Sequence, residues 1–232
     1  MIMPAGPPFQ VVFFDCDSTL SAVEGIDELA RHAGVVERVE PLTRAAMEGR
    51  TPLEEVYGHR LDLIKPDQAD IDWLGRCYVA GMVAGAEETV TALRNLGKEV
   101  HIVSGGIRQA VLCLAAALAI PAEHVYAVEV NFDTTGCYAG YDKTSPLTRS
   151  GGKGVICRRA ASESGPAVLI GDGITDLEAA EAGVFVVGFG GVVRREAMVK
   201  GAAAYVDSPS LAAVLDIILT SEERSRIGAS IV

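Results

Sequence analysis

The sequence predicts an α/β fold, a doubly wound and mainly parallel sheet with a small helical domain and a short β-hairpin inserted into it. Short apolar runs recur along the chain, and several are continuous rather than alternating, which is typical of parallel strands buried on both faces. Helical patterns lie between these runs, and strands that alternate with helices indicate a doubly wound sheet. A helical stretch of about 60 residues follows the first strand, which indicates an insertion before the rest of the core.

Five apolar runs are the predicted strands. They comprise residues 9–14 (FQVVFF), 99–103 (EVHIV), 167–170 (AVLI), 184–189 (VFVVGF) and 203–206 (AAYV). Two of the intervening helical patterns end at glycines that can cap a helix C-terminus, Gly97 and Gly183. The apolar segment 110–120 is shorter than the roughly 20 residues that a membrane span needs, so it is predicted to be a core helix.

Two segments interrupt the alternation of strands and helices. The predicted boundaries are residues 21–80 for a helical domain, and residues 1–20 and 81–232 for the core. In the helical domain, one helix is predicted to stop at Gly34, and another to begin with Thr51 as N-cap, Pro52 in the first turn and Glu54 completing a capping box. Alternating residues around a Thr-Thr-Gly turn in segment 125–141 predict a short antiparallel hairpin added to the sheet.

Composition excludes several classes of protein. Lys and Arg number 20 against 31 Asp and Glu, a net charge of -11, and an acidic surface disfavours nucleic acid and anionic membranes as partners. A small anionic substrate stays compatible, because salt limits the repulsion to roughly 8 Å. The N-terminal residues lack the pattern of a secretory signal, so a cytoplasmic location is expected. The five cysteines are scattered and odd in number, which favours buried free thiols.

Polar residues follow three of the predicted strands. They are Asp15 and Asp17 after the first strand, Ser104, Gly105 and Gly106 after the second, and Asp172 and Asp176 after the third. Ligands of open α/β sheets bind outside the carboxyl ends of the strands, so these residues are expected to form one site. Carboxylates gathered there repel one another unless a cation lies among them, and all-oxygen ligands favour Mg²⁺.

The stretch Asp15-Cys-Asp-Ser-Thr19 resembles the D-x-D-x-[ST] signature of the haloacid dehalogenase superfamily of phosphotransferases. The other marks of that superfamily follow in its order, namely Ser104, Lys153 in SGGKG, and Asp172 and Asp176 in GDGITD. Longer stretches resemble the phosphoserine phosphatases, a family within the superfamily, from about residue 9 to residue 206. These are DSTLSAVEGIDELA, LTRAAMEG, IVSGGIR, AGYD, SGGKG and IGDGITDLEAA.

The resemblance implies a Rossmann-like core and assigns roles at the site. It makes Asp15 the nucleophile that forms an aspartyl-phosphate, and Asp17 the general acid and then the general base. It also implies that Asp15, the backbone carbonyl of Asp17 and Asp172 hold Mg²⁺, with Asp176 supporting the metal or Lys153. The residues implied to hold the phosphate are Lys153, Ser104 and Gly106, and Gly105 and Thr175 are implied to bind the substrate as well.

Substrate choice is expected to come from the helical domain acting as a cap over the site. The resemblance assigns Glu24 to the substrate ammonium, Arg60 to its carboxylate and Met47 to the pocket wall. Each charged residue has a structural alternative. Glu24 can close a capping box with Ser21, and Arg60 can extend to solvent past the core of the cap. Two other arginines could hold the carboxylate, Arg44 and Arg50.

The sequence therefore predicts a Mg²⁺-dependent phosphatase that hydrolyses O-phospho-L-serine, acting as a monomer or homodimer on a small phosphomonoester. One departure from the family pattern is Glu48, where a glycine is more usual, and this acid either narrows the pocket or turns outward. Glu48 therefore leaves an alternative function open, namely a related enzyme that acts on another small phosphomonoester, such as phosphohomoserine, or that transfers the phosphoryl group to an alcohol. A more distant alternative is a regulatory module that accepts phosphate on Asp15.

Overall fold

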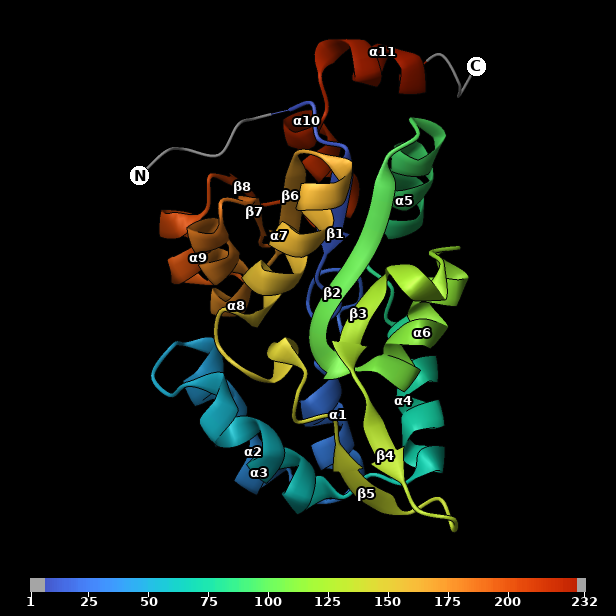
Figure 1. The fold of residues 1–232 in the computed structure, drawn as a ribbon, viewed down its shortest axis with the longest axis vertical. Coiled ribbons are helices and arrows are strands. Elements are labelled where there is room, and N and C mark those ends of the chain that lie inside the picture. Colours follow the sequence, from blue (N-terminus) through green and yellow to red (C-terminus); the bar gives the residue numbers. More distant parts are fainter. Residues whose placement is uncertain (1–6, 229–232) are drawn as a thin grey trace.

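The computed structural model describes residues 7–228 and contains a six-stranded parallel sheet (Figure 1). The strands follow the order β3-β2-β1-β6-β7-β8. Their bounds are Val11–Phe14 (β1), Glu99–Ile107 (β2), Val125–Val128 (β3), Ala167–Gly171 (β6), Phe185–Phe189 (β7) and Ala204–Val206 (β8). The prediction of a doubly wound, parallel sheet is confirmed, and the five predicted runs supply five of its six strands.

Strand β1 lies at the centre of the sheet. Val11 pairs with Glu99 of β2 on one side and with Ala167 of β6 on the other. All four residues of β1 are completely buried, because neighbouring strands cover its edges and helices cover its faces. A strand whose two faces are both covered needs apolar side chains at every position, and the continuous apolar run that predicted β1 meets this requirement.

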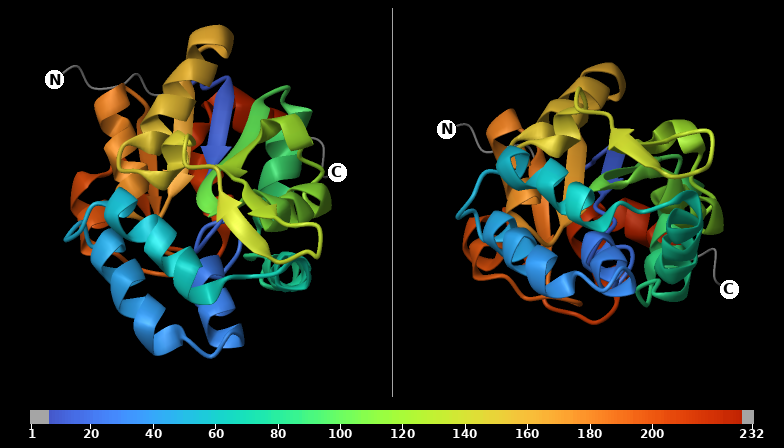
Figure 2. Two further views of the ribbon diagram at one scale, coloured as in Figure 1. Left: turned by 60° about the horizontal axis from the view of Figure 1, so that its bottom comes forward. Right: turned by 90° about the horizontal axis from the view of Figure 1, so that it is seen from below.

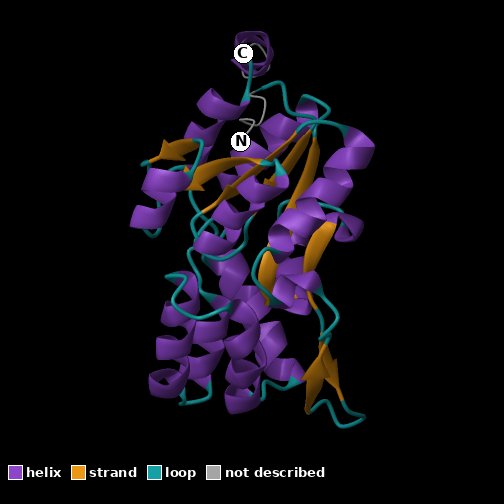
Figure 3. Cartoon of the chain, turned by 60° about the vertical axis from the view of Figure 1, so that its left-hand side comes forward, coloured by secondary structure: helices purple, strands orange, loops and turns teal. Residues whose placement is uncertain are grey.

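Helices flank the sheet on both faces (Figure 3). In chain order they are α5 (Ala86–Asn95), α6 (Arg108–Ala117), α7 (Gly152–Ser164), α8 (Ile174–Leu177) and α9 (Glu196–Gly201). Short 3₁₀ helices complete these connections at Ala122–His124 (η1), Pro146–Thr148 (η2) and Glu178–Ala182 (η3). Gly97 and Gly183 take positive φ angles of 78° and 82° just beyond their helices, as predicted for C-terminal caps. Within residues 7–228, no helix is both long and apolar enough to span a membrane.

Four helices lie beyond the carboxyl ends of the strands (Figures 1 and 2). They are α1 (Gly25–His32), α2 (Val36–Met47), α3 (Leu53–Ile64) and α4 (Gln68–Ala80). Helix α4 packs against α6 of the core, and α2 packs against α3. The predicted capping box of α3 is wrong, because the helix starts at Leu53 and its N-cap is Pro52. Thr51 is therefore one residue too early, and the Glu54 carboxylate accepts a hydrogen bond from the Ser150 amide instead.

The hairpin is present, but its predicted place in the main sheet is wrong. Strands β4 (Val130–Phe132) and β5 (Tyr138–Tyr141) pair antiparallel and form a separate two-stranded sheet. Strand β3 uses the free edge of β2, so the chain that follows leaves the sheet and reaches α3 (Figure 1). There the ring of Tyr141 lies 5.2 Å from the ring of Tyr57.

The expectation of buried thiols is only partly right. All five cysteines are free, but only Cys16 and Cys157 are buried. Cys77 is half-buried, and Cys113 and Cys137 are exposed. The last two lie on a helix and a hairpin loop at the surface, and a scattered spacing carries no information on which face of an element a cysteine occupies.

The C-terminal segment, for which the sequence offers no motif, folds back on the amino ends of the strands. It contains η4 (Leu211–Val214), α10 (Leu215–Ile218) and α11 (Ser221–Gly228). The buried ammonium of Lys98 donates to the Phe9 carbonyl at 2.6 Å and to the Glu223 carboxylate at 2.5 Å. This ion pair ties α11 to the start of the sheet.

Glu223→Gln is expected to lower the free energy of unfolding by about 2 kcal/mol, because it leaves the Lys98 ammonium buried without its counter-charge. Urea unfolding of the wild type and the variant measures the difference. The matched control is Glu222→Gln, one residue away at an exposed position, which is expected to change stability by less than about 0.5 kcal/mol. Equal losses in both variants would contradict the assigned ion pair.

A buried histidine lies near the amino end of β2. His101 stacks on His124 with ring centroids 4.2 Å apart and also contacts the ring of Phe13. Glu99 is its acidic neighbour, at 3.5 Å. Burial lowers the pKa of His101 below its ordinary value of 6.5, and His124 lowers it further.

The contribution of His101 to stability is therefore expected to fall as the pH drops below about 6.5, because the unfolded chain then binds a proton that folded His101 resists. Above that pH both states are neutral at His101, and this contribution is constant. Thermal unfolding of the wild type and of His101→Phe at pH 7.5 and 5.5 isolates this contribution, because the raised pKa values of Glu24 and Asp172 act on both proteins alike. Relative to the variant, the wild type is expected to be less stable at pH 5.5 than at pH 7.5. The exposed His59→Gln is the control, and it should leave the pH dependence unchanged.

Candidate active site

Ten of the twelve predicted site residues line one cavity at the carboxyl ends of the central strands, between the sheet and helices α1 to α4, whereas Ser104 and Asp176 are completely buried beside it. The cavity measures about 870 Å³ with its open mouth included. The predicted residues that line it are Asp15, Asp17, Glu24, Met47, Arg60, Gly105, Gly106, Lys153, Asp172 and Thr175. Strand β2 continues to Ile107 rather than ending at Val103. Ser104, Gly105 and Gly106 therefore belong to the carboxyl end of this strand, next to the cavity, and not to a loop.

Lys153 connects two of the site carboxylates. Its ammonium lies 2.7 Å from Asp15 Oδ2 and 2.7 Å from Asp176 Oδ1. Burial disfavours the charge of Lys153, but Asp15 and Asp176 outweigh burial and raise its pKa. The glycine before it allows this position, because a Cβ on Gly152 would lie 1.9 Å from the Pro146 carbonyl oxygen. The second glycine of the SGGKG stretch is therefore a packing requirement at the start of α7.

Three buried carboxylates form an all-oxygen cluster. One oxygen from each of Asp15, Asp172 and Asp176 lies within 4.8 Å of the others. Burial raises the pKa of Asp15 well above its ordinary value, and it raises the pKa of Asp172 to about 6. The negative charges of neighbouring carboxylates also repel one another, and a divalent cation between them would relieve this repulsion. The donor set of carboxylate oxygens fits a hard ion such as Mg²⁺. The side chain of Asp176 joins the cluster while it also accepts from the Gly173 amide at 3.1 Å.

Asp17 is turned away from that cluster. Its Oδ1 accepts from the Gly25 amide at 2.6 Å and from the Tyr78 hydroxyl at 2.9 Å, and its Oδ2 lies 3.4 Å from the Ser104 hydroxyl. Burial raises the pKa of Asp17, whereas the bonds from Gly25 and Tyr78 lower it. The two aspartates of the D-x-D motif thus have different surroundings, one beside an ammonium and one beside neutral donors.

Glu24 is the N-cap residue of α1, but its side chain lines the cavity and makes no capping hydrogen bond. It accepts a hydrogen bond from the Ser18 hydroxyl at 2.7 Å, and the Ser21 hydroxyl instead donates to the Tyr78 carbonyl. The alternative of a capping box with Ser21 is therefore wrong. Burial raises the pKa of Glu24 to about 8, with Asp17 and Asp172 adding to the shift.

Arg195 is a site residue that the sequence reasoning missed. Its Nε donates to Asp172 Oδ2 at 2.8 Å, and one terminal nitrogen donates to Glu24 at 3.1 Å. Arg195 thus connects Asp172 of the carboxylate cluster to Glu24, which lies at the N-terminus of α1. Arg195 follows β7 after a glycine-rich turn, and the rule that placed the other polar residues at strand ends could have selected it.

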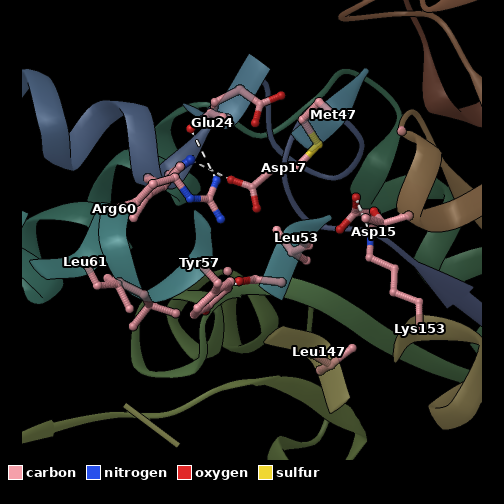
Figure 4. A pocket seen from close by; sticks show the side chains of 18 of the residues that line it. Asp15, Asp17, Glu24, Met47, Leu53, Tyr57, Arg60, Leu61, Leu147 and Lys153 are labelled. Atoms are coloured by element: carbon pink, nitrogen blue, oxygen red, sulfur yellow. Dashed lines mark hydrogen bonds and ion pairs between the residues drawn. The ribbon is translucent and has the colours of Figure 1, made fainter. Parts of the chain in front are cut away.

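Arg60 lies inside the cavity wall, as Figure 4 shows. Its side chain donates to the Thr43 hydroxyl at 3.2 Å, and its guanidinium carbon lies 5.5 Å from the centre of the Tyr57 ring. The residue is 4% exposed, so the alternative of a side chain that extends to solvent is wrong. Burial lowers its pKa, and its buried Nε has no hydrogen-bond partner among the described residues. Arg60 is thus a charge that a bound anion would satisfy.

The other two candidate arginines do not reach the cavity. Arg44 pairs with Glu40, and Arg50 pairs with Glu48, all at exposed positions. Glu48 is half exposed and turns outward, so it does not narrow the pocket. Tyr57, which the sequence did not single out, donates from α3 to the Gly105 carbonyl at 2.9 Å and joins the helical region to β2.

Comparison with known proteins adds independent findings. Residues 12–181 match the haloacid dehalogenase-like hydrolase family. The phosphoserine phosphatase of Homo sapiens is 38% identical over 197 residues, which cover 84% of this chain and 88% of the human protein. That of Methanocaldococcus jannaschii is 33% identical over 173 residues, 72% of this chain and 79% of the archaeal one. A solved phosphoserine phosphatase with bound substrate is 26% identical and superimposes with a TM-score of 0.79 over 92% of this chain and all of that one.

Proposed function

The chain belongs to the haloacid dehalogenase-like hydrolase family, and from this we infer that it hydrolyses O-phospho-L-serine to L-serine and inorganic phosphate. Relatives that carry the phosphoserine phosphatase name align with most of the chain, which supports the assignment of both reaction and substrate. The observation that carries it is a buried arginine and a half-buried glutamate in the cavity that also holds Asp15. A phosphorylated amino acid has the two complementary charges, a carboxylate and an ammonium.

We assign the nucleophile to Asp15. Its carboxylate oxygen attacks phosphorus, the bond from phosphorus to the serine oxygen breaks, and the phosphoryl group remains on Asp15. Lys153, 2.7 Å from the Asp15 carboxylate, is held by Asp176 where it can neutralise charge on the transferring group. We also assign to the phosphate Gly105, Gly106 and Thr175, which line the cavity, and Ser104, whose hydroxyl accepts a hydrogen bond from the Gly106 amide at 2.9 Å.

Asp17 moves the protons. In the first step it gives a proton to the leaving serine oxygen, and in the second it takes one from the water that attacks the phosphoryl group. That water releases phosphate and restores the Asp15 carboxylate. The Oδ2 atom of Asp17 lies 3.4 Å from the Ser104 hydroxyl, and Asp17 is not part of the carboxylate cluster that contains Asp15.

Mg²⁺ is the metal that we propose for the site. The carboxylates of Asp15 and Asp172 and the backbone carbonyl of Asp17 would hold it, with Asp176 fixing Lys153 beside them. A metal ion there would neutralise negative charge that develops on the phosphoryl oxygens.

Substrate choice rests on residues 21–80, which we propose as the cap domain. Arg60 and Glu24 are assigned to the carboxylate and the ammonium of the substrate, with Met47 as part of the wall. An incoming ammonium would favour the ionised form of Glu24, whose pKa of about 8 reflects burial among other acids. Because Glu48 turns outward, it gives no reason to prefer a different phosphomonoester. A cytoplasmic location and a monomeric or dimeric state remain predictions.

Phosphate release tests this function directly. Purified protein is assayed with L-phosphoserine, phosphohomoserine, phosphothreonine and 4-nitrophenyl phosphate, with Mg²⁺ or with a chelator. We expect phosphoserine to have the largest kcat/KM, and chelation to abolish the activity. Hydrolysis of the aryl phosphate alone would keep the chemistry and reject the substrate, whereas a long-lived phosphorylated protein with negligible turnover would indicate the regulatory module.

A further inference from the structure

We propose that Tyr78 is a positioning residue for Asp17, one that confines the transferable proton of Asp17 to the oxygen that faces the substrate. This inference rests on the proposed function, because it concerns the acid and base of that reaction. Tyr78 lies on α4, some sixty positions from Asp17 in sequence, and its hydroxyl donates to Asp17 Oδ1 at 2.9 Å. Neither the family marks in the sequence nor the strand-end rule points to it.

The two oxygens of Asp17 have unequal surroundings. Oδ1 accepts two hydrogen bonds, from the Gly25 amide and the Tyr78 hydroxyl, and an sp² oxygen has two lone pairs. Oδ2 has only the longer contact with the Ser104 hydroxyl, at 3.4 Å. When Asp17 is protonated, the proton therefore resides on Oδ2. That oxygen faces Ser104 and Gly106, at the phosphate end of the cavity.

The residues around Tyr78 hold its hydroxyl at hydrogen-bond distance from Asp17 Oδ1. The side chain is completely buried, and the Ser21 hydroxyl fixes its backbone carbonyl at 3.0 Å. A Cβ at position 25 would lie 2.0 Å from the Tyr78 oxygen, so only glycine there leaves room for both donors to reach Asp17. Phenylalanine fits the same space without the hydroxyl, which makes Tyr78→Phe a change of one hydrogen bond.

The consequence for chemistry depends on the leaving group. When the bond from phosphorus to the serine oxygen breaks, an alkoxide would form unless the proton on Asp17 Oδ2 moves to that oxygen. A 4-nitrophenolate ion leaves without a proton, because its negative charge is delocalised over the ring. A residue that places the acid proton therefore affects phosphorylation of Asp15 by phosphoserine and leaves phosphorylation by 4-nitrophenyl phosphate almost unchanged.

The test compares the rate of phosphorylation of Asp15 by the two substrates in Tyr78→Phe, with Mg²⁺ present. Single-turnover release of serine and the burst of 4-nitrophenolate report this step before dephosphorylation, which also uses Asp17. We expect the serine rate to fall about 10- to 100-fold and the nitrophenolate burst by less than about 3-fold. Thermal unfolding verifies that the variant is folded.

Tyr57→Phe is the matched comparison, since it removes a buried hydroxyl in the same cavity that contacts Gly105 rather than Asp17. It is expected to change both rates by the same factor. Equal slowing of both substrates in Tyr78→Phe, or no slowing of either, would overturn the positioning role. If the wild type hydrolyses another alkyl phosphate instead of phosphoserine, the proposed substrate fails, and the comparison is made with that alkyl phosphate against the aryl one.

Discussion

Replacing Asp15 with asparagine is expected to reduce phosphoserine turnover by a factor of about 10⁴ or more, because an amide oxygen is a poor nucleophile for phosphorus. Asparagine keeps the size of the side chain, so the cavity and its other residues stay in place. Phosphate release under saturating phosphoserine measures the loss. Asp142→Asn, in a turn after β5 outside the cavity, is the control, and it should retain wild-type activity.

The same variant distinguishes a covalent route from direct attack by water. Acid quenching during turnover with phosphoserine labelled in its phosphoryl group should leave label on the wild-type protein and none on Asp15→Asn. Activity within about 10-fold of wild type, or label retained by the variant, would reject Asp15 as the nucleophile.

Arg60→Met is expected to reduce kcat/KM for phosphoserine by about 10²- to 10³-fold, because it removes the buried charge that we assign to the substrate carboxylate. Phosphoethanolamine has the phosphate and the ammonium but no carboxylate, so its kcat/KM should change by less than about 3-fold. The ratio of the two values separates loss of a specific contact from a general disturbance of the cavity.

Arg44→Met is the matched control for this prediction, since Arg44 is exposed and pairs with Glu40. It should leave both kcat/KM values at the wild-type level. Equal losses on phosphoserine and phosphoethanolamine in Arg60→Met would mean that Arg60 supports the cavity and does not contact the carboxylate.

The parts of the site that the sequence predicted share a physical rule. Asp15 and Asp172 follow strands that are each readable as a continuous apolar run, and Ser104 lies near the end of β2, where its predicted run stops; parallel strands bring their carboxyl ends together. Once the strands are known, the convergence of these residues needs no knowledge of side-chain packing. The central sheet and the flanking helices were predictable for the same reason.

The parts that the sequence did not reveal depend on packing between distant segments. Tyr78 looks like an ordinary apolar position of a helix until α4 is placed against Asp17. Arg195 stands among surface-like charged residues, and only the fold brings it to Asp172. The hairpin was recognised from its local alternation, but its departure from the main sheet depends on β3 filling the edge of β2.

The central position of β1 has a consequence for how the chain folds during synthesis. Val11 is made early, yet its partners in β2 and β6 follow about 90 and about 150 residues later. At roughly 5 to 20 residues per second, the second partner leaves the ribosome roughly 8 to 30 s after β1. An entirely apolar strand thus keeps an unpaired edge until β6 has been made, and nascent chains that stall before β6 expose this edge to aggregation.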